Sequence, residues 1–209
     1  QKAFDTISFG EADVLARAPV EHGRQQGAAL REDGDGARPR WGLRERGVDA
    51  IVRPAMRYWH PFTEETLSEF KHAGVRRLVA LTLYPHYSLA TTGSSINELK
   101  RVIERDFPDD FDVRYIREWP SLPKYLDALA TKVERTLATL SDDTRINVTL
   151  LFSAHGLPVD FIERGAPYIE HIHETVHGVM ERLSEKPPWC LAYQSRVGPV
   201  KWLEPTTPD

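Results

Sequence analysis

Cysteine is the scarcest residue of this 209-residue chain, since Cys190 is the only one. A single thiol excludes an internal disulfide, and it excludes an iron–sulfur cluster held by the thiolates of this chain alone. We therefore expect neither a disulfide framework nor an iron–sulfur cluster. So little cysteine is typical of proteins that work in a reducing compartment.

Excess positive charge and long apolar runs are also lacking. The formal net charge is −4, from 27 Lys and Arg against 31 Asp and Glu, so the whole chain offers no electrostatic footprint for nucleic acid. We find no signal-peptide pattern and no apolar run long enough to cross a bilayer. With 41% hydrophobic and 28% charged residues, the composition is that of an ordinary globular protein with one sizeable core or two small ones.

Residues 1–47 differ in composition from the rest of the chain. Residues 23–47 are rich in Gly, Arg and acidic residues and have few apolar anchors, which predicts a loop, disorder or a helix broken by an insertion. From Val48 onward, apolar runs alternate with amphipathic segments. They predict strands over 48–58, 76–84, 111–119, 146–152 and 189–195, and helices over 63–73, 94–105, 123–140 and 167–183.

This alternation predicts βαβ units and a mostly parallel sheet, hence an α/β fold. Residues 146–152 are apolar and β-branched enough for a strand that is buried on both faces. Thr63 is the expected N-cap of the first helix, and acidic residues follow it in the first turn. Prolines at 120 and 123 predict a domain boundary between them.

The most informative segment, Ser153-Ala154-His155-Gly156, follows the strand predicted at 146–152. Ligands of open α/β sheets bind outside the carboxyl ends of the strands, where His155 is expected. A neutral imidazole can ligate a metal or act as a base near physiological pH. By position alone, a histidine merely hydrogen-bonded in a loop is an equally good interpretation. A hydrolase dyad of Ser153 and His155 is disfavoured, because the G-x-S-x-G elbow is missing.

Residues 173–177 match H-E-x-x-H, the helix-borne zinc motif of metalloproteases. The neighbouring apolar positions place His173 and His177 largely on the polar face of the helix, and no convincing third ligand follows. We interpret the pair as part of a solvated helix face rather than as a protease site.

Residues 84–95 follow one predicted strand and open the next helix. Their hydroxyls and the backbone N–H groups of a helix N-terminus suit an anion such as phosphate or carboxylate, although a capped turn without a ligand fits equally well. Arg57 and Tyr58 end an earlier strand on the same carboxyl rim, where arginine could pair with a ligand carboxylate.

Several of these motifs, in this order and spacing, resemble ferrochelatase, the class II chelatase that inserts Fe²⁺ into a porphyrin. The resemblance covers roughly Val48 to the end of the chain. The motifs that carry it lie at residues 55–65, 84–88 with 91–95, 117–120, 153–158, 164–168 and 193–203.

The resemblance implies insertion of Fe²⁺ into protoporphyrin IX to form protohaem. His155 would ligate the metal or accept a proton from a pyrrole nitrogen. The porphyrin would contact Arg57, Tyr58, Thr92, Gly93, Ser94, Gln194 and Ser195. Porphyrin and ferrous iron are then the partners, with iron as a substrate and no tightly bound cofactor.

The implied fold is a pair of Rossmann-like, class II chelatase-like parallel-sheet domains, both incomplete. Residues 1–47 match the family poorly, residues 48–120 belong to the N-terminal domain, and residues 121–209 begin the C-terminal domain. The family's Leu-Gly-Gly-Pro opening strand is absent, and the Ile-Glu-Thr-Leu motif that supplies a glutamate opposite the histidine is expected after Asp209. Ala166 and Ala90 replace an aspartate and a serine of the family's motifs. The chain therefore resembles a ferrochelatase fragment, for which we expect weak metal binding and doubtful turnover.

Two alternatives stay open. One is another class II chelatase, such as one inserting cobalt into a sirohydrochlorin, although the aromatic motifs at 60–62 and 84–87 favour the haem branch. The other is a non-catalytic porphyrin- or haem-binding remnant. The resemblance also implies a cytoplasmic, bacterial protein that does not bind nucleic acid. Peripheral membrane contact and the oligomeric state stay open, while Gly156 favours protoporphyrin over coproporphyrin by resemblance.

Overall fold

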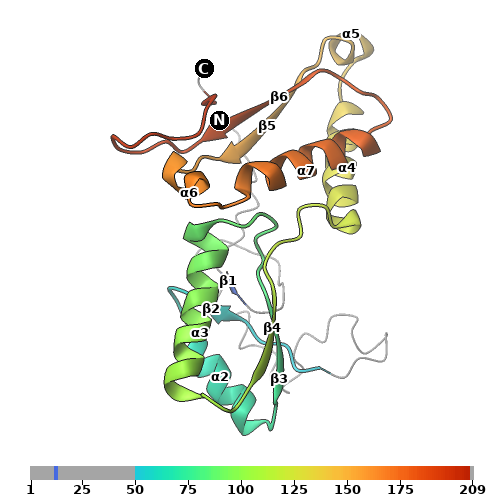
Figure 1. Ribbon diagram of the computed structural model, residues 1–209. Helices are drawn as coiled ribbons and strands as arrows, with labels where there is room; N and C mark the ends of the chain where they lie inside the picture. The colour runs from blue at the N-terminus through green and yellow to red at the C-terminus, as the bar shows by residue number, and fades with distance from the viewer. Residues whose placement is uncertain (1–11, 14–49, 208–209) are drawn as a thin grey trace. The chain divides into compact units, whose positions relative to one another are not determined.

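The computed structural model describes residues 12–13 and 50–207 (Figure 1). The prediction of a loop, disorder or a broken helix over residues 23–47 lies outside the described residues. Of residues 1–47, the structure describes only Ala12 and Asp13. Contacts divide the chain into two compact units, and helices alternate with parallel strand pairs in both. The first unit runs to Tyr84 and continues over Ala90–Arg117, and the second comprises Pro85–Leu89 and Glu118 onward. The α/β fold class predicted from the sequence is confirmed.

In the first unit, two parallel strands carry the helices. Its elements are β1 (Ala12–Asp13), β2 (Ala55–Met56), α2 (Thr63–His72), β3 (Arg77–Leu81), the π-helix η2 (Leu89–Gly93, of which Leu89 belongs to the second unit), α3 (Ser94–Asp106) and β4 (Asp112–Ile116). β3 pairs in parallel with β4, with Arg77 opposite Asp112, and β1 pairs antiparallel with β2. Leu78 and Ala80 of β3 point into a core shared with α2 and α3. The alternation of buried and exposed residues along β3 shows that helices cover one face of this pair.

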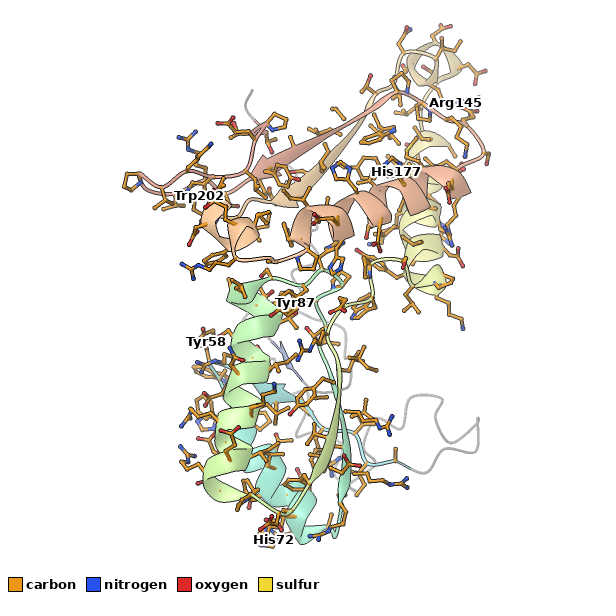
Figure 2. The ribbon with its side chains drawn as sticks, in the orientation of Figure 1. Tyr58, His72, Tyr87, Arg145, His177 and Trp202 are labelled. Atoms are coloured by element: carbon orange, nitrogen blue, oxygen red, sulfur yellow. The ribbon has the colours of Figure 1, made fainter. Side chains whose placement is uncertain are left out.

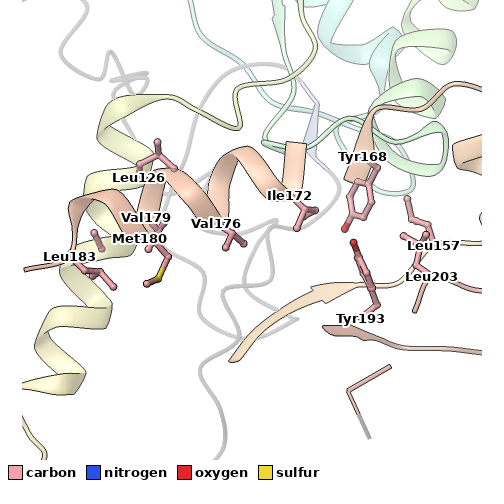
Figure 3. Packing of buried hydrophobic residues seen from close by; sticks show 11 residues of the cluster. Leu126, Leu157, Tyr168, Ile172, Val176, Val179, Met180, Leu183, Tyr193 and Leu203 are labelled. Carbon is pink, nitrogen blue, oxygen red and sulfur yellow. The ribbon is translucent and has the colours of Figure 1, made fainter. Parts of the chain in front are cut away.

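In the second unit, another parallel pair supports the helices. Its elements are α4 (Pro123–Leu137), α5 (Asp142–Arg145), β5 (Leu150–His155), α6 (Val159–Glu163), α7 (Tyr168–Arg182) and β6 (Trp189–Gln194). The ladder between β5 and β6 runs from Leu150 opposite Trp189 to His155 opposite Gln194. Ile172, Val176 and Val179 of α7 form a buried stripe, and Leu126 of α4 belongs to the same core (Figure 3). Their spacing along α7 is that of one helix face.

The segment after β6 returns along the second unit. The N–H of Tyr193 donates to the carbonyl of Pro205 (2.9 Å), and the N–H of Thr207 donates to the carbonyl of Tyr193 (2.9 Å). Farther back in the segment, the N–H of Leu203 donates to the carbonyl of Leu157 (3.0 Å). These bonds fix both the end of β6 and the turn after β5. None of the described helices is long and apolar enough to cross a membrane.

The strand predicted at 146–152 is wrong at both ends and on burial. Ile146 follows the short helix α5 with 81% of its surface exposed, and β5 starts only at Leu150. The strand then continues through His155, which is thus its last residue rather than part of a turn. Burial on both faces is also contradicted, because Leu151 is 54% exposed. Side chains of β5 alternate between a covered and an open face.

Three predicted features of the first unit are corrected as well. The strand predicted over 48–58 shortens to β2, where Pro54 has no N–H to extend a ladder. The N-cap of α2 is Phe62 rather than Thr63, and the N–H of Phe62 donates to the Glu65 carboxylate (2.6 Å). Finally, the helix predicted to start at Ser94 is preceded directly by another helical segment: Gly93 has helical angles (φ −59°, ψ −47°), and η2 runs into α3. The helix N-terminus expected at Ser94 for an anion is therefore not free.

Candidate functional site

His155 stands at the carboxyl end of β5 with its backbone fixed on both sides. The Tyr168 hydroxyl donates to the His155 carbonyl (3.0 Å), and the next N–H, that of Gly156, donates to the carbonyl of Gln194 (2.7 Å). The imidazole itself is exposed and has no hydrogen-bond partner in the part of the chain that the structure describes. The backbone is thus held while the ring is free to bind a ligand.

Gly156 is required by the close approach of β6. A Cβ at this position would lie 2.8 Å from the carbonyl oxygen of Gln194 and 3.4 Å from the Trp202 ring. The first distance is shorter than real Cβ atoms show, and the atom it meets is rigid backbone. Glycine therefore allows β5 and β6 to stay paired up to His155 and Gln194.

Gln194 and Ser195 lie beside His155 at the same end of the sheet. Gln194 is the register partner of His155 and is exposed. Ser195, which follows, has φ 72°, in the left-handed region that non-glycine residues rarely adopt. Such strain is found at ligand-binding sites more often than elsewhere, because the surrounding structure must impose it. Three of the residues predicted from the sequence are therefore brought together here.

A buried polar network lies around Thr175, in the middle of α7. The Thr175 hydroxyl donates to the Pro120 carbonyl (2.8 Å), and His86 Nε2 lies 2.8 Å from the same hydroxyl oxygen. Since the Thr175 proton is already used, His86 Nε2 donates to Thr175. Burial, with a smaller contribution from His171, lowers the pKa of His86 to about 4, so His86 is neutral at physiological pH.

This network also reaches Tyr168, which holds the His155 carbonyl. The His86 and Tyr168 rings meet edge to face with their centroids 6.1 Å apart. Figure 3 shows the hydroxyl ends of Tyr168 and Tyr193 directed toward each other. Burial is the main cause that raises the pKa of both phenols, so both remain protonated donors.

Sequence reasoning missed Tyr168, His86 and Thr175. Thr175 carried a usable signal, because it directly precedes Val176 on the predicted apolar face of the helix. A hydroxyl at such a position needs a buried partner.

In the first unit, Arg57 joins several of the predicted residues. Its Nε lies 3.4 Å from Ser94 Oγ, its guanidinium lies 5.0 Å from the centre of the Tyr58 ring, and a guanidinium nitrogen approaches the Glu98 carboxylate at 4.0 Å. The hydrogen bond from Arg101 is the main cause that lowers the pKa of Glu98, and Arg57 contributes to the same effect. Arg57 is therefore held by a carboxylate that Arg101 also contacts, while Tyr58, labelled in Figure 2, is 60% exposed by its accessible surface.

Thr92 and Gly93 lie deeper than Arg57 and Tyr58. Thr92 has no exposed surface, and its hydroxyl lies 3.2 Å from that of Thr82. Gly93 is buried as well. The structure thus places these two predicted porphyrin contacts beneath the surface, where Thr92 fixes η2 against the end of β3.

The H-E-x-x-H segment does not form a three-ligand metal centre in the described residues. Among the residues from 50 to 207, no three His, Cys, Asp or Glu side chains lie close enough to hold one ion. Thr175 of the motif is buried, whereas His173 is half-buried and His177 is exposed. The rings of His173 and His177 stack, with centroids 6.0 Å apart. At the disfavoured hydroxyl–histidine pair of Ser153 and His155, Ser153 Oγ lies within hydrogen-bond distance of Thr207 Oγ1 (3.4 Å).

These features are compatible with a known class of α/β protein. Parallel strand pairs with covering helices, and an exposed histidine at a strand's carboxyl end, fit a class II chelatase-like α/β protein. Comparison with known families then gives a specific assignment. The family model described as "Ferrochelatase" matches residues 20–209, and the chain belongs to the ferrochelatase family.

Curated relatives agree with this assignment. The chain is 54% identical over 155 residues to a protein named ferrochelatase from Geotalea uraniireducens, which covers 74% of this chain and 47% of the relative. It is 54% identical over 163 residues to a ferrochelatase from Geotalea daltonii, and this match covers 78% of the present chain and 49% of the relative. A ferrochelatase from Synechococcus sp. strain RCC307 is 44% identical over 169 residues, and this match covers 80% of the present chain and 43% of the relative. The chain spans about half the length of the curated relatives it matches.

Proposed function

We propose that this chain takes part in the insertion of Fe²⁺ into protoporphyrin IX to form protohaem. The observation that carries the proposal is the exposed imidazole of His155 at the carboxyl end of β5 in a ferrochelatase-family chain; this ring has no hydrogen-bond partner among the described residues. Fe²⁺ and the porphyrin are the substrates, and the chain needs no resident cofactor for this chemistry.

The reaction requires two pyrrole N–H protons to leave as the dication enters the ring. Neutral imidazole can accept such a proton or ligate the incoming metal, but the same nitrogen cannot do both at once. Because the Tyr168 hydroxyl and the Gly156 N–H fix the backbone around His155, the ring can turn about its side-chain bonds without moving the strand. Gln194 and Ser195 add an amide and a hydroxyl at the same end of the sheet.

The first unit supports a role in binding the acidic side chains of the porphyrin. Arg57 carries a guanidinium that can pair with a carboxylate, and the exposed Tyr58 ring lies 5.0 Å from it. We propose that Arg57, Tyr58 and Ser94 contact the porphyrin directly. Thr92 and Gly93, which are buried, would act by holding η2 in place.

The test is to mix the chain with protoporphyrin IX and Zn²⁺, a substitute for oxygen-sensitive iron, and to follow zinc porphyrin by fluorescence. We expect slow insertion that His155→Ala abolishes, while His72→Gln in the other unit leaves it unchanged. Equal insertion rates with and without His155 would contradict the role given to this residue.

Porphyrin binding without insertion is the alternative. Quenching of porphyrin fluorescence by the chain, with no zinc porphyrin formed, would support it. Sirohydrochlorin with Co²⁺ serves as the comparison substrate, and we expect no insertion into it.

We further propose a cytoplasmic location, with peripheral contact with a membrane. Fractionation of expressing cells, followed by a salt wash of the membranes, tests both statements. Chain found only in the membrane fraction after the wash would contradict them.

A further inference from the structure

The histidines in the described residues fall into two groups. Four have a ring nitrogen within hydrogen-bond distance of a protein group, namely His60, His72, His86 and His171. Three have no such partner within residues 50–207: His155, His173 and His177. A ring nitrogen without a protein partner is free to bind a ligand, as proposed above for His155. His173 and His177 have no role in that proposal.

These two histidines are placed for joint binding. They are four residues apart on α7, which puts them one turn apart on the same helix face. Their rings are nearly parallel, at 27°, and their centroids are 6.0 Å apart. The edge-to-face contact of His177 with the Trp189 ring, at 5.6 Å and 89°, restricts one of the two rings (Figure 2 labels His177).

We propose that His173 and His177 together chelate one divalent late transition-metal ion, with water completing its coordination. Metal–imidazole bonds are about 2 Å long. An imidazole nitrogen binds a metal in the plane of its ring, so the ion would lie at the edge of the stacked pair, and both side chains must rotate until a nitrogen of each points to it. Since no third protein ligand lies nearby in the described part of the chain, the ion stays exchangeable. For nitrogen ligands the affinity should follow the usual order, with Cu²⁺ bound more tightly than Ni²⁺, and Ni²⁺ more tightly than Co²⁺.

This metal site lies apart from His155 within the same unit. His177 packs on Trp189, which pairs with Leu150 at one end of the sheet, whereas His155 pairs with Gln194 at the other end. Trp189 and Gln194 are five positions apart along β6, which corresponds to about 16 Å at the usual rise of a parallel strand. The two sites can therefore be tested independently, and the metal site does not depend on the proposed reaction.

Trp189 provides the readout, because bound Cu²⁺ quenches a nearby indole. Titration with Cu²⁺ is followed by tryptophan fluorescence and, in parallel, by calorimetry. We expect His173→Gln and His177→Gln each to weaken Cu²⁺ binding at least about tenfold, because each variant loses the second, linked ligand. Trp189→Phe should abolish most of the quenching while the calorimetric affinity stays the same.

His72→Gln and His155→Ala are the matched controls, and both should bind Cu²⁺ at the α7 pair as the unchanged chain does. Far-UV circular dichroism establishes that every variant is folded. Unchanged affinity in both His173→Gln and His177→Gln would overturn the proposal. So would a loss of the same size in His72→Gln, or a loss that occurs only in His155→Ala.

Discussion

The two units present their candidate residues in opposite ways. In the second unit, hydrogen bonds hold the backbone around His155, while the ring is exposed and has no hydrogen-bond partner within residues 50–207. In the first unit, the side chains themselves are engaged: Arg57 contacts Ser94 and Glu98, and Thr92 is buried against Thr82. The difference predicts which substitutions affect folding and which affect only function. Changes to the supports should destabilise the protein, whereas removal of the His155 ring should not.

Gly156→Ala should have the largest effect on stability. The added Cβ would lie 2.8 Å from the Gln194 carbonyl oxygen, so the paired ends of β5 and β6 must separate. Overpacking of this kind costs about 1–3 kcal/mol, and we expect a value near the upper end. Urea unfolding measures it, with Ser153→Ala on the open face of β5 as the control. A loss below about 0.5 kcal/mol in Gly156→Ala would mean that the backbone at His155 is not rigid.

The buried network of the second unit should make its stability depend on pH. His86 has a folded pKa of about 4, below its ordinary value, so the unfolded chain binds more protons between pH 6.5 and 4. Stability should therefore fall as the pH drops through this range, by about 2 kcal/mol between pH 7 and pH 5. Urea unfolding at both pH values measures the change.

His86→Gln removes this ionisation, so the pH dependence of the variant should be smaller by about the same amount. An identical pH profile in the variant would show that another group controls acid stability.

Thr92→Val tests the corresponding support in the first unit. The substitution keeps the shape of the side chain but leaves the buried Thr82 hydroxyl without this partner, at a cost of about 1–2 kcal/mol. Thermal unfolding measures the loss, and Thr139→Val on an exposed turn is the control. If Thr92→Val were neutral for stability yet weakened porphyrin binding, Thr92 would contact the ligand directly, and the contrast between the units would fail.

The smallest stability effects are expected for the exposed residues themselves. His155→Ala should change the free energy of unfolding by less than about 0.5 kcal/mol, because His155 is exposed and its ring has no hydrogen bond or ion pair within the described residues. Arg57→Gln should cost up to about 1 kcal/mol, because it loses a partly exposed ion pair. Parallel denaturation curves measure both. A larger loss for His155→Ala than for Arg57→Gln would reverse the comparison.

The alternation of elements was predictable from the sequence, whereas their ends were less so. The apolar stripe of α7 and the proline at the start of α4 gave these helices within a few residues. The start of β5 was missed because Ile146 and Val148 have the side chains of strand residues, whereas Ile146 is the C-cap of the short helix α5 and is exposed. The start of α3 at Ser94 was predicted correctly, but only the structure shows that Gly93 before it has helical angles and belongs to η2.

The candidate site was likewise predictable only in part. The position of His155 at a strand end followed from an apolar run and from the rule on carboxyl ends, whereas Gln194 and Ser195 came only from the family resemblance. The sequence could not show that Thr92 is buried or that Tyr168 holds the His155 carbonyl. Both depend on contacts between residues of different elements, which no local pattern encodes.

The returning segment at Tyr193 has a consequence for hydrogen exchange. The N–H and the carbonyl of Tyr193 both bond to residues 205–207 of the returning segment, while the ladder with β5 holds the other edge of β6. The amide protons of Tyr193 and Thr207 should therefore exchange with deuterium at one shared, slow rate, because a single opening of the segment exposes both. That rate measures how often the chain beside the Gln194 and Ser195 end of the sheet detaches.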